Sequence, residues 1–168
     1  PRPETEGLVE LALGCRRSGR AADVGTGSGC VALSLRQEGD FAQVVGIDVS
    51  AAALDLARGN GRDLGLPVAW LRADLTSALP TGSLDVLVSN AGIALGAPLA
   101  TLAVADWDRV FAVDARATWL LARSARAALA KRRGTIVAVA SVSAHYPFPG
   151  RGAYSPAKAA LVMLCRQL

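Results

Sequence analysis

The chain has 168 residues, of which 52% are hydrophobic, enough for one domain with a buried core and too apolar for a disordered chain. No apolar run approaches the roughly 18 residues that a membrane-spanning helix requires, and no leader segment is evident. The net charge of +4 comes from scattered basic residues, which argues against nucleic-acid binding. Three cysteines without a C-x-x-C pair predict reduced thiols, and we expect a soluble cytoplasmic protein.

The predicted elements alternate between helices and strands along the chain. Helical patterning is expected over 4–14, 30–36, 51–60, 106–131 and from about 155 onward. Short apolar runs with the composition of buried strands lie at 21–24, 43–47, 68–71, 84–89 and 135–140. Ser50 is placed to cap the third helix, and Asp106 or the region of Thr101 to cap the long one.

Strands that are apolar along their whole length are buried on both faces, as in a parallel sheet covered by helices on either side. Right-handed crossovers and a glycine-rich turn after the first strand favour the strand order 3-2-1-4-5. The sequence therefore predicts an α/β protein of one domain over 1–168. We expect a Rossmann-like three-layer α/β/α sandwich on a five-stranded parallel sheet.

A glycine-rich turn, Gly-Thr-Gly-Ser-Gly at 25–29, joins the first strand to the next helix. Glycines let the backbone turn tightly and approach a ligand. A dinucleotide fingerprint would place its third glycine at Cys30, one position later than in this chain. The turn therefore predicts a nucleotide-type ligand and departs from the dinucleotide pattern.

Two acidic residues follow the next strands, at the edge of the sheet where such folds bind ligands. Asp48 is placed to accept both hydroxyls of a ribose and to repel a 2′-phosphate, and Asp74 is placed to accept from an adenine amino group. The predicted adenosine-binding residues are Asp23, Gly25, Thr26, Gly27, Gly29, Asp48, Asp74 and Asn90. The lone His145 has no partner at metal-ligand spacing, so we predict no metal site.

Residues 1–90 resemble the glutamine methyltransferases that modify peptide chain release factors. The resemblance rests on the segment P-R-P-E-T-E at 1–6, the acid-preceded glycine turn, Asp48 and Asp74. It implies S-adenosylmethionine as the cofactor. The family's N-P-P-Y motif, which receives the substrate amide, is absent because Ala91 and Gly92 follow Asn90.

Residues 90–168 resemble the short-chain dehydrogenases/reductases. The matching features are Asn90-Ala91-Gly92, the helix start at 106–111, Ser141, and Tyr154 four positions before Lys158. Lys158, one helical turn from Tyr154, can lower a phenol pKa from about 10 so that the phenol transfers a proton. The resemblance implies NAD as the cofactor and Ser141, Tyr154 and Lys158 as catalytic residues.

This second resemblance is also incomplete. Asp114 stands where the family usually has an asparagine, and the family's T-G-x-x-x-G-x-G cofactor turn is replaced by the turn of the first half. Each half therefore lacks a part of the machinery that its resemblance implies.

The simplest hypothesis is a recombination of two Rossmann-like halves near Asn90, engineered or natural. We expect a residual site for S-adenosylmethionine or a similar adenosine ligand, with little or no catalysis. The alternatives are a weak NAD-dependent reductase, a protein glutamine methyltransferase, and a fold that binds no cofactor. Apolar residues on the last two helices predict a homodimer or other self-association, and they include Trp107, Phe111, Trp119, Leu120 and Met163.

Overall fold

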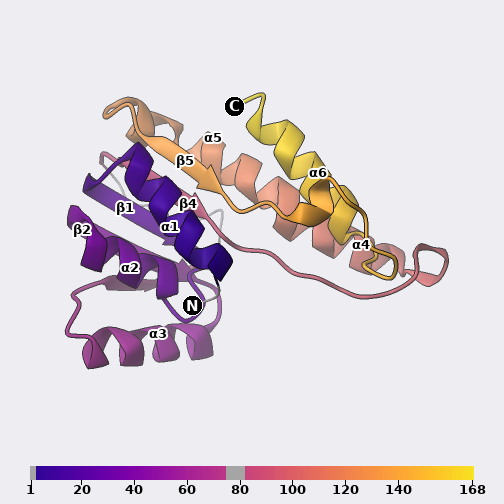
Figure 1. Ribbon diagram of the computed structural model, residues 1–168, viewed down its shortest axis with the longest axis horizontal. Coiled ribbons are helices and arrows are strands. Elements are labelled where there is room, and N and C mark those ends of the chain that lie inside the picture. Colours follow the sequence, from indigo (N-terminus) through magenta and orange to yellow (C-terminus); the bar gives the residue numbers. More distant parts are fainter. Residues whose placement is uncertain (1–2, 75–81) are drawn as a thin grey trace.

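The computed structural model describes residues 3–74 and 82–168. Its helices are α1 (Pro3–Cys15), α2 (Cys30–Glu38), α3 (Ala51–Asp63), α4 (Val104–Phe111), α5 (Ala117–Ala130) and α6 (Tyr154–Cys165). Its strands are β1 (Ser18–Val24), β2 (Asp40–Asp48), β3 (Ala69–Arg72), β4 (Val86–Ser89) and β5 (Thr135–Ala138). The strands form one parallel sheet in the order β3-β2-β1-β4-β5, which confirms the predicted topology (Figure 1).

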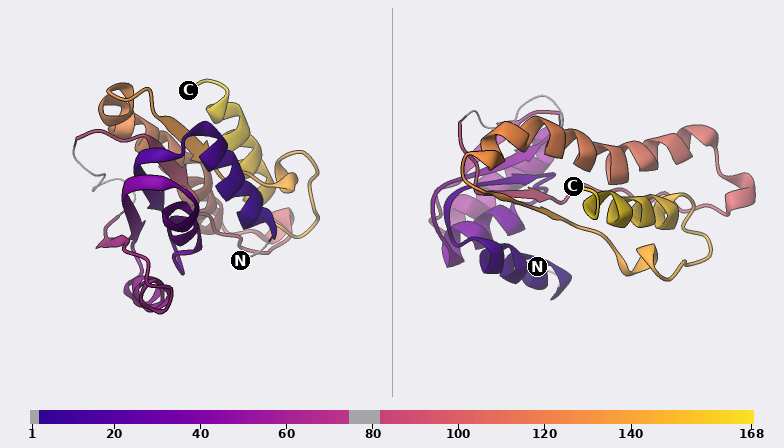
Figure 2. Two further views of the ribbon diagram at one scale, coloured as in Figure 1. Left: turned by 60° about the vertical axis from the view of Figure 1, so that its left-hand side comes forward. Right: turned by 90° about the horizontal axis from the view of Figure 1, so that it is seen from above.

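Helices cover both faces of this sheet, as the three-layer prediction requires (Figures 1 and 2). On one face, α1 and α2 pack over a core formed by alternate residues of β1, β2 and β4. On the other face, α5 packs through Leu121, Ala125 and Leu129 over the remaining residues of the same strands. Each core draws side chains from before and after Asn90, so the two halves of the chain share both of them.

The predicted helix 106–131 is only partly correct. The helix begins earlier, at Val104, and its N-cap residue Ala103 makes no side-chain capping bond, so neither Asp106 nor Thr101 caps it. Asp106 instead lies in the first turn, where a carboxylate interacts favourably with the helix dipole. A π-helical turn at Ala112–Arg116 then separates α4 from α5. By contrast, the predicted cap of α3 is confirmed, since the Ser50 side chain accepts from the backbone N–H of Ala53 at 3.2 Å.

Helices α4 and α6 project beyond the carboxyl edge of the sheet and form a lobe with the loops around them (Figures 1 and 2). The lobe has a small core of its own, in which Val110 of α4 packs with Ala153 and Ala157 at the start of α6. The sequence did not predict this projection. Within the part of the chain that the structure describes, no helix combines the length and apolar character needed to cross a membrane.

The indole of Trp70 fixes the spacing between β3, β2 and the start of α2. Trp70 lies beside Gly46 in the register of β3 and β2, and a Cβ atom at Gly46 would overlap the indole ring. A Cβ atom at Gly29, where φ is +83°, would lie 2.6 Å from another ring carbon. Trp70 therefore packs directly on the backbone of two glycines, one of which ends the glycine-rich turn.

We predict that Gly46→Ala destabilises the protein by about 1–3 kcal/mol, because the methyl group has no space beside the ring. Gly59→Ala is the matched control, since Gly59 lies inside α3 with no atom within 4 Å of its Cβ position. The control should stabilise the protein by about 0.5–1 kcal/mol through its helix propensity. Urea unfolding of the two variants measures both effects, and equal stability of the two would contradict the packing described for Trp70.

Candidate functional site

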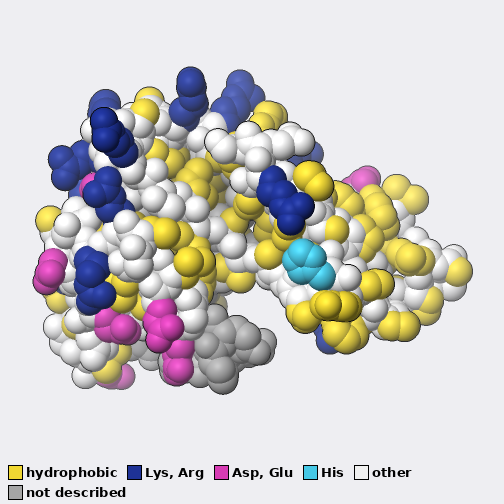
Figure 3. Space-filling model, turned by 45° about the horizontal axis from the view of Figure 1, so that its top comes forward, with side chains coloured by type: hydrophobic (Ala, Val, Ile, Leu, Met, Phe, Trp, Pro, Cys, Tyr) yellow, Lys and Arg dark blue, Asp and Glu magenta, His cyan; other side chains and the backbone are white. Residues whose placement is uncertain are grey.

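The predicted ligand-binding residues gather where the strands end, at the edge of the sheet that faces the lobe. The space-filling view shows the molecule hollowed between the body of the sheet and the lobe, which carries the single histidine, His145 (Figure 3). Asn90 follows β4 at this edge, and its N–H donates to the carbonyl of Val24 at 3.0 Å. The two halves of the chain therefore meet at this edge.

The glycine-rich turn directs its backbone amides inward. The N–H groups of Gly25 and Thr26 both donate to the carbonyl of Ile47, at 2.9 and 3.0 Å, and the N–H of Gly29 donates to the carbonyl of Thr26 at 2.9 Å. A Cβ atom at Gly25 would lie 2.6–2.7 Å from atoms of Ala91, so β1 and the segment after β4 touch through a glycine. The predicted turn is confirmed, and protein groups already accept from these amides.

Asp48 ends β2 beside this turn, with its side chain half-buried. Its two carboxylate oxygens accept from the backbone N–H groups of Gly27 and Ser50, each at 2.9 Å. A carboxylate oxygen can accept a second hydrogen bond, so Asp48 retains capacity for ligand hydroxyls. Its bond to Gly27 also fixes the middle of the turn.

Asp23 is fully buried beneath the turn. One of its oxygens accepts from the Thr26 hydroxyl at 2.6 Å and from the N–H of Ala32 at 3.2 Å, whereas the other has no hydrogen-bond partner. The pKa of Asp23 is raised from 3.8 to about 6, chiefly because the carboxyl group is buried. The hydrogen bonds from Thr26 and Ala32 lower this pKa, and the nearby charge of Asp48 raises it. Asp23 thus braces the turn from below, and two carboxyl groups lie close together at this edge.

Asp74 is exposed and borders a cleft of about 510 Å³ between the ends of β2 and β3 and the helices after α4. The other lining residues are Val49, Ala112, Val113, Arg116, Ala117 and Leu120. The cleft is therefore mostly apolar, with one acidic and one basic side chain. Such a lining suits a flat base that carries an amino group.

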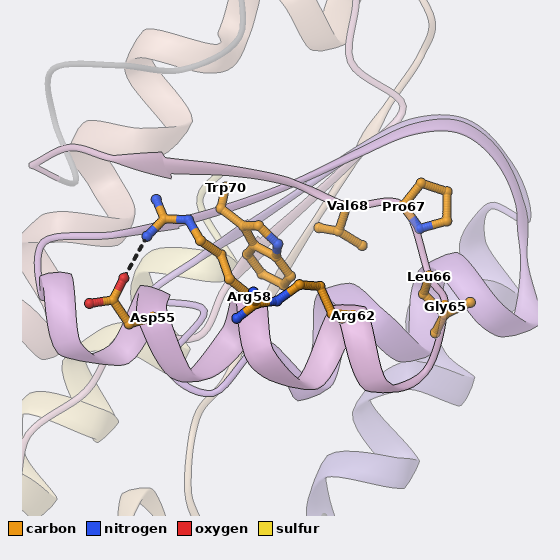
Figure 4. A pocket seen from close by; sticks show the side chains of 9 residues that line it. Asp55, Arg58, Arg62, Gly65, Leu66, Pro67, Val68 and Trp70 are labelled. Carbon is orange, nitrogen blue, oxygen red and sulfur yellow. Dashed lines mark hydrogen bonds and ion pairs between the residues drawn. The ribbon is translucent and has the colours of Figure 1, made fainter.

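A larger cleft, of about 810 Å³, lies between α3 and β3 (Figure 4). It is lined by Trp70, Arg58 and Arg62, and Arg58 forms an ion pair with Asp55 at 2.9 Å. None of the predicted site residues lines it. Trp70 separates this cleft from the glycine-rich turn, and the absence of every predicted site residue from its lining makes it a poor candidate for the ligand site despite its size.

The predicted catalytic residues of the second half lie at the start of α6 and in the segment before it. Tyr154 is half-buried, and the Lys158 ammonium lies 5.7 Å from the centre of its ring. Ser141 precedes the short helix Val142–Ala144, which packs against α6, and its hydroxyl oxygen accepts from the N–H of Ser143 at 3.1 Å. The structure therefore brings the three residues to one region and uses Ser141 to cap a turn.

Lys158 is buried, and its ammonium donates to the carbonyl of Val139 at 2.9 Å. It also forms an ion pair at 3.6 Å with Asp114, which is buried in the π-helical turn and accepts from the N–H of Ile93 at 2.8 Å. Burial raises the pKa of Asp114, while the Ile93 N–H and Lys158 lower it. Lys158 is thus held on the side of Asp114 and Val139.

Sequence reasoning identified Asp114 as a departure from a family pattern and missed its pairing with Lys158. A signal was present, because Val110, Asp114, Ala117 and Leu121 follow helical spacing and all lie on the buried side. An acidic residue on such a stripe needs a buried partner. The partner itself comes from α6, 44 positions later, and the sequence pattern gives no indication of it.

Comparison with known families assigns the two halves of the chain. The family model of a methyltransferase domain matches residues 22–111, and that of short chain dehydrogenases matches residues 67–168, each more than half of the chain. The chain belongs to both families. The two matches overlap over 67–111, on either side of Asn90, so the sequence is a chimera of a methyltransferase-like and a dehydrogenase-like half, as predicted.

Individual relatives divide in the same way. The release factor glutamine methyltransferase of Nitratidesulfovibrio vulgaris is 47% identical over 95 residues, which are 54% of this chain and 32% of that protein. The 2-(S)-hydroxypropyl-CoM dehydrogenase 3 of Xanthobacter autotrophicus is 41% identical over 115 residues, 67% of this chain and 45% of that protein. The cis-4-hydroxycyclohexanecarboxylate dehydrogenase of Sinomonas cyclohexanicum is 38% identical over 154 residues, 84% of this chain and 61% of that protein. The chain therefore spans between 32% and 61% of the length of these relatives.

Solved structures of dehydrogenases share the fold. NAD+-bound xylitol dehydrogenase superposes with a TM-score of 0.79 at 22% identity, over 90% of this chain and 64% of that one. A short chain dehydrogenase from Mycobacterium smegmatis superposes with a TM-score of 0.78 at 28% identity, over 92% of this chain and 70% of that one. The methyltransferase-like half thus adopts the backbone arrangement of a dehydrogenase sheet.

The buried carboxyl group of Asp23 predicts a specific pH dependence of stability. Because its pKa is raised to about 6 in the folded chain, the folded state holds this proton more tightly than the unfolded state. The contribution of Asp23 to stability is therefore present below pH 3.8 and is lost as the pH rises to about 6, by about 3 kcal/mol. Asp23→Asn removes this loss and keeps an acceptor for Thr26 and Ala32.

Urea unfolding at steps between pH 4 and pH 7 tests this expectation, with exposed Asp55→Asn as the control. We expect the free energy of unfolding of Asp23→Asn to increase relative to that of the parent chain as the pH rises. The control should follow the parent. Parallel pH profiles for Asp23→Asn and the parent would contradict the raised pKa.

Proposed function

We propose that the protein binds an adenosine-containing ligand of the S-adenosylmethionine type at the carboxyl edge of its sheet, with little or no catalytic turnover. The observation that carries the proposal is the hydrogen bond from the N–H of Gly27 to the carboxylate of Asp48, at 2.9 Å. A phosphate group at such a turn is bound by free backbone N–H groups. In this turn the N–H groups of Gly25, Thr26 and Gly29 also donate to the protein, which leaves fewer amides for a phosphate and supports a ligand without one.

Charge supports the same choice of ligand. Asp48 and Asp23 both lie against the turn, close enough for Asp48 to raise the pKa of Asp23. Two carboxyl groups repel the pyrophosphate of a dinucleotide and attract a cation. S-adenosylmethionine carries a positive sulfonium, a positive ammonium group and one carboxylate, so that its net charge is positive, and it has no phosphate.

The adenosine part fits the remaining features of this edge. Asp48 can accept from ribose hydroxyls with the lone pairs that Gly27 and Ser50 leave free. The adjoining cleft offers apolar walls at Val49 and Leu120 for a base, and Asp74 at its border as an acceptor for the amino group. In this proposal, Asp48 and Asp74 select adenosine and the turn excludes a pyrophosphate.

Both sets of catalytic groups are incomplete, which supports binding with little turnover. Asn90 is followed by Ala91 and Gly92, which offer no aromatic ring and no pair of prolines to receive a glutamine amide. In the other half, Lys158 is paired with Asp114. S-adenosylmethionine would supply a transferable methyl group, and we propose that none of the described residues at this edge is arranged to present an acceptor to it.

The origin and the assembly of the chain are part of the proposal. We infer that recombination near Asn90 produced the chain, and engineering is our hypothesis for how it occurred. We also propose a homodimer, because β5 is an edge strand of the described sheet and Trp119 and Met163 are exposed on the helices beside it.

Parallel calorimetric titrations with S-adenosylmethionine, S-adenosylhomocysteine, NAD and NADH test the choice of ligand. We expect the first two to bind and Asp48→Ala to weaken their binding at least tenfold. The variant removes the acceptor for the ribose hydroxyls and the hydrogen bond that fixes the Gly27 N–H. Asp55→Ala, which alters an exposed aspartate in the outer cleft, should bind as the parent chain does. Tighter binding of NAD than of S-adenosylhomocysteine would overturn the proposal, as would unchanged binding by Asp48→Ala.

A further inference from the structure

We propose that Asp114 is a positioning residue that holds Lys158 in a buried ion pair and so withholds the lysine charge from the hydroxyl of Tyr154. This inference concerns the second half of the chain and does not depend on which ligand binds at the glycine-rich turn. It explains how a chain can carry Tyr154 and Lys158 at reductase spacing while the effect of the lysine charge on the phenol is weakened.

The contacts of Lys158 carry the first step. Its ammonium donates to the carbonyl of Val139 at 2.9 Å and faces one carboxylate oxygen of Asp114 at 3.6 Å. That oxygen is buried and accepts no hydrogen bond, so the lysine charge is its main compensation. The side chains of both residues are almost fully buried, with 4% and 0% of their surface exposed.

The backbone around the pair fixes this arrangement. The other oxygen of Asp114 accepts from the N–H of Ile93 at 2.8 Å, which orients the carboxylate. Gly92 lies directly beside the pair, since a Cβ atom there would be 3.2 Å from the Lys158 ammonium and 3.6 Å from the Asp114 oxygen. The segment after β4 therefore covers the ion pair, and glycine at position 92 leaves space for the Lys158 ammonium and the Asp114 carboxylate.

No other buried charge competes for the lysine on the described elements that pack against α6. Asp114 is the buried acid of the π-helical turn, whereas Arg116 in the same turn is exposed. On α4, Asp106 is half-buried, and Asp108 and Arg109 are exposed. The short helix Val142–Ala144, which also packs against α6, carries no charged residue. Exposed charges are screened by water and salt, and Asp114 is the acid that pairs with the Lys158 ammonium, at 3.6 Å.

The pairing of Lys158 with Asp114 affects how readily the hydroxyl of Tyr154 ionises. The ammonium lies 5.7 Å from the centre of the phenol ring, and a positive charge near an acidic group favours its ionised form. A carboxylate at 3.6 Å from the same ammonium cancels most of that effect. Neutralising Asp114 therefore restores an unopposed cation next to Tyr154.

The test is the pH at which Tyr154 ionises, followed by phenolate absorbance in a Tyr146→Phe background, which leaves Tyr154 as the one tyrosine of the chain. Asp114→Asn keeps an acceptor for the Ile93 N–H and removes the negative charge. We expect its titration midpoint to lie about one pH unit below that of the background chain. The double variant Asp114→Asn/Lys158→Met buries no charge at this position and should return to the background midpoint or above it.

The two variants separate the possible causes. An unchanged midpoint in Asp114→Asn would overturn the proposal. A lowered midpoint that persists in the double variant would overturn it too, because Asp114 would then act on Tyr154 directly and not through Lys158. Far-ultraviolet circular dichroism of each variant verifies that the comparison is made between folded chains.

Discussion

The glycine-rich turn after β1 is the constraint on which the rest of the ligand edge depends. Gly25 touches the backbone of Ala91, so any side chain at this position would push the segment after β4 away. The same turn donates its amides to the carbonyl of Ile47 and to the carboxylate of Asp48. The turn that follows β1 is therefore held in place by the end of β2 and by the segment after β4. The turn acts as a structural joint as well as a candidate ligand site.

This joint explains how a chimera of two families can keep one fold. β1 lies in the centre of the sheet and pairs with β2 from its own half and with β4 at the boundary between the halves. Buried Asp85, directly before β4, adds a second link, since it accepts from the N–H of Arg20 on β1 and from the Arg132 side chain after α5. Hydrogen bonds of the parallel sheet are insensitive to side-chain identity, so the boundary near Asn90 preserves them.

The sequence predicted the sheet well and its functional edge less completely. Strand order followed from apolar runs and crossover rules, and the cap at Ser50 followed from local chemistry. The direction of the amides at Gly25 and Gly27 was beyond prediction, because it depends on left-handed backbone angles that glycine permits without requiring. The pairing of Asp114 with Lys158 was also beyond prediction, because it depends on how α6 packs in the lobe. Ser141, which the resemblance gives as a catalytic residue, also accepts from the N–H of Ser143, a local bond that the sequence analysis did not predict.

Nuclear magnetic resonance of the ¹⁵N-labelled chain, followed at the Gly27 amide, reports directly on this turn and on the ligand that it accepts. Because Asp48 accepts from this N–H, we expect slow hydrogen exchange in the free chain and in the presence of S-adenosylhomocysteine. Signals of the turn should shift with S-adenosylhomocysteine at concentrations at which NAD leaves them in place. Fast exchange at Gly27 in the free chain, or shifts that NAD induces at lower concentration than S-adenosylhomocysteine, would contradict a turn that is closed to phosphates and selects an adenosine ligand.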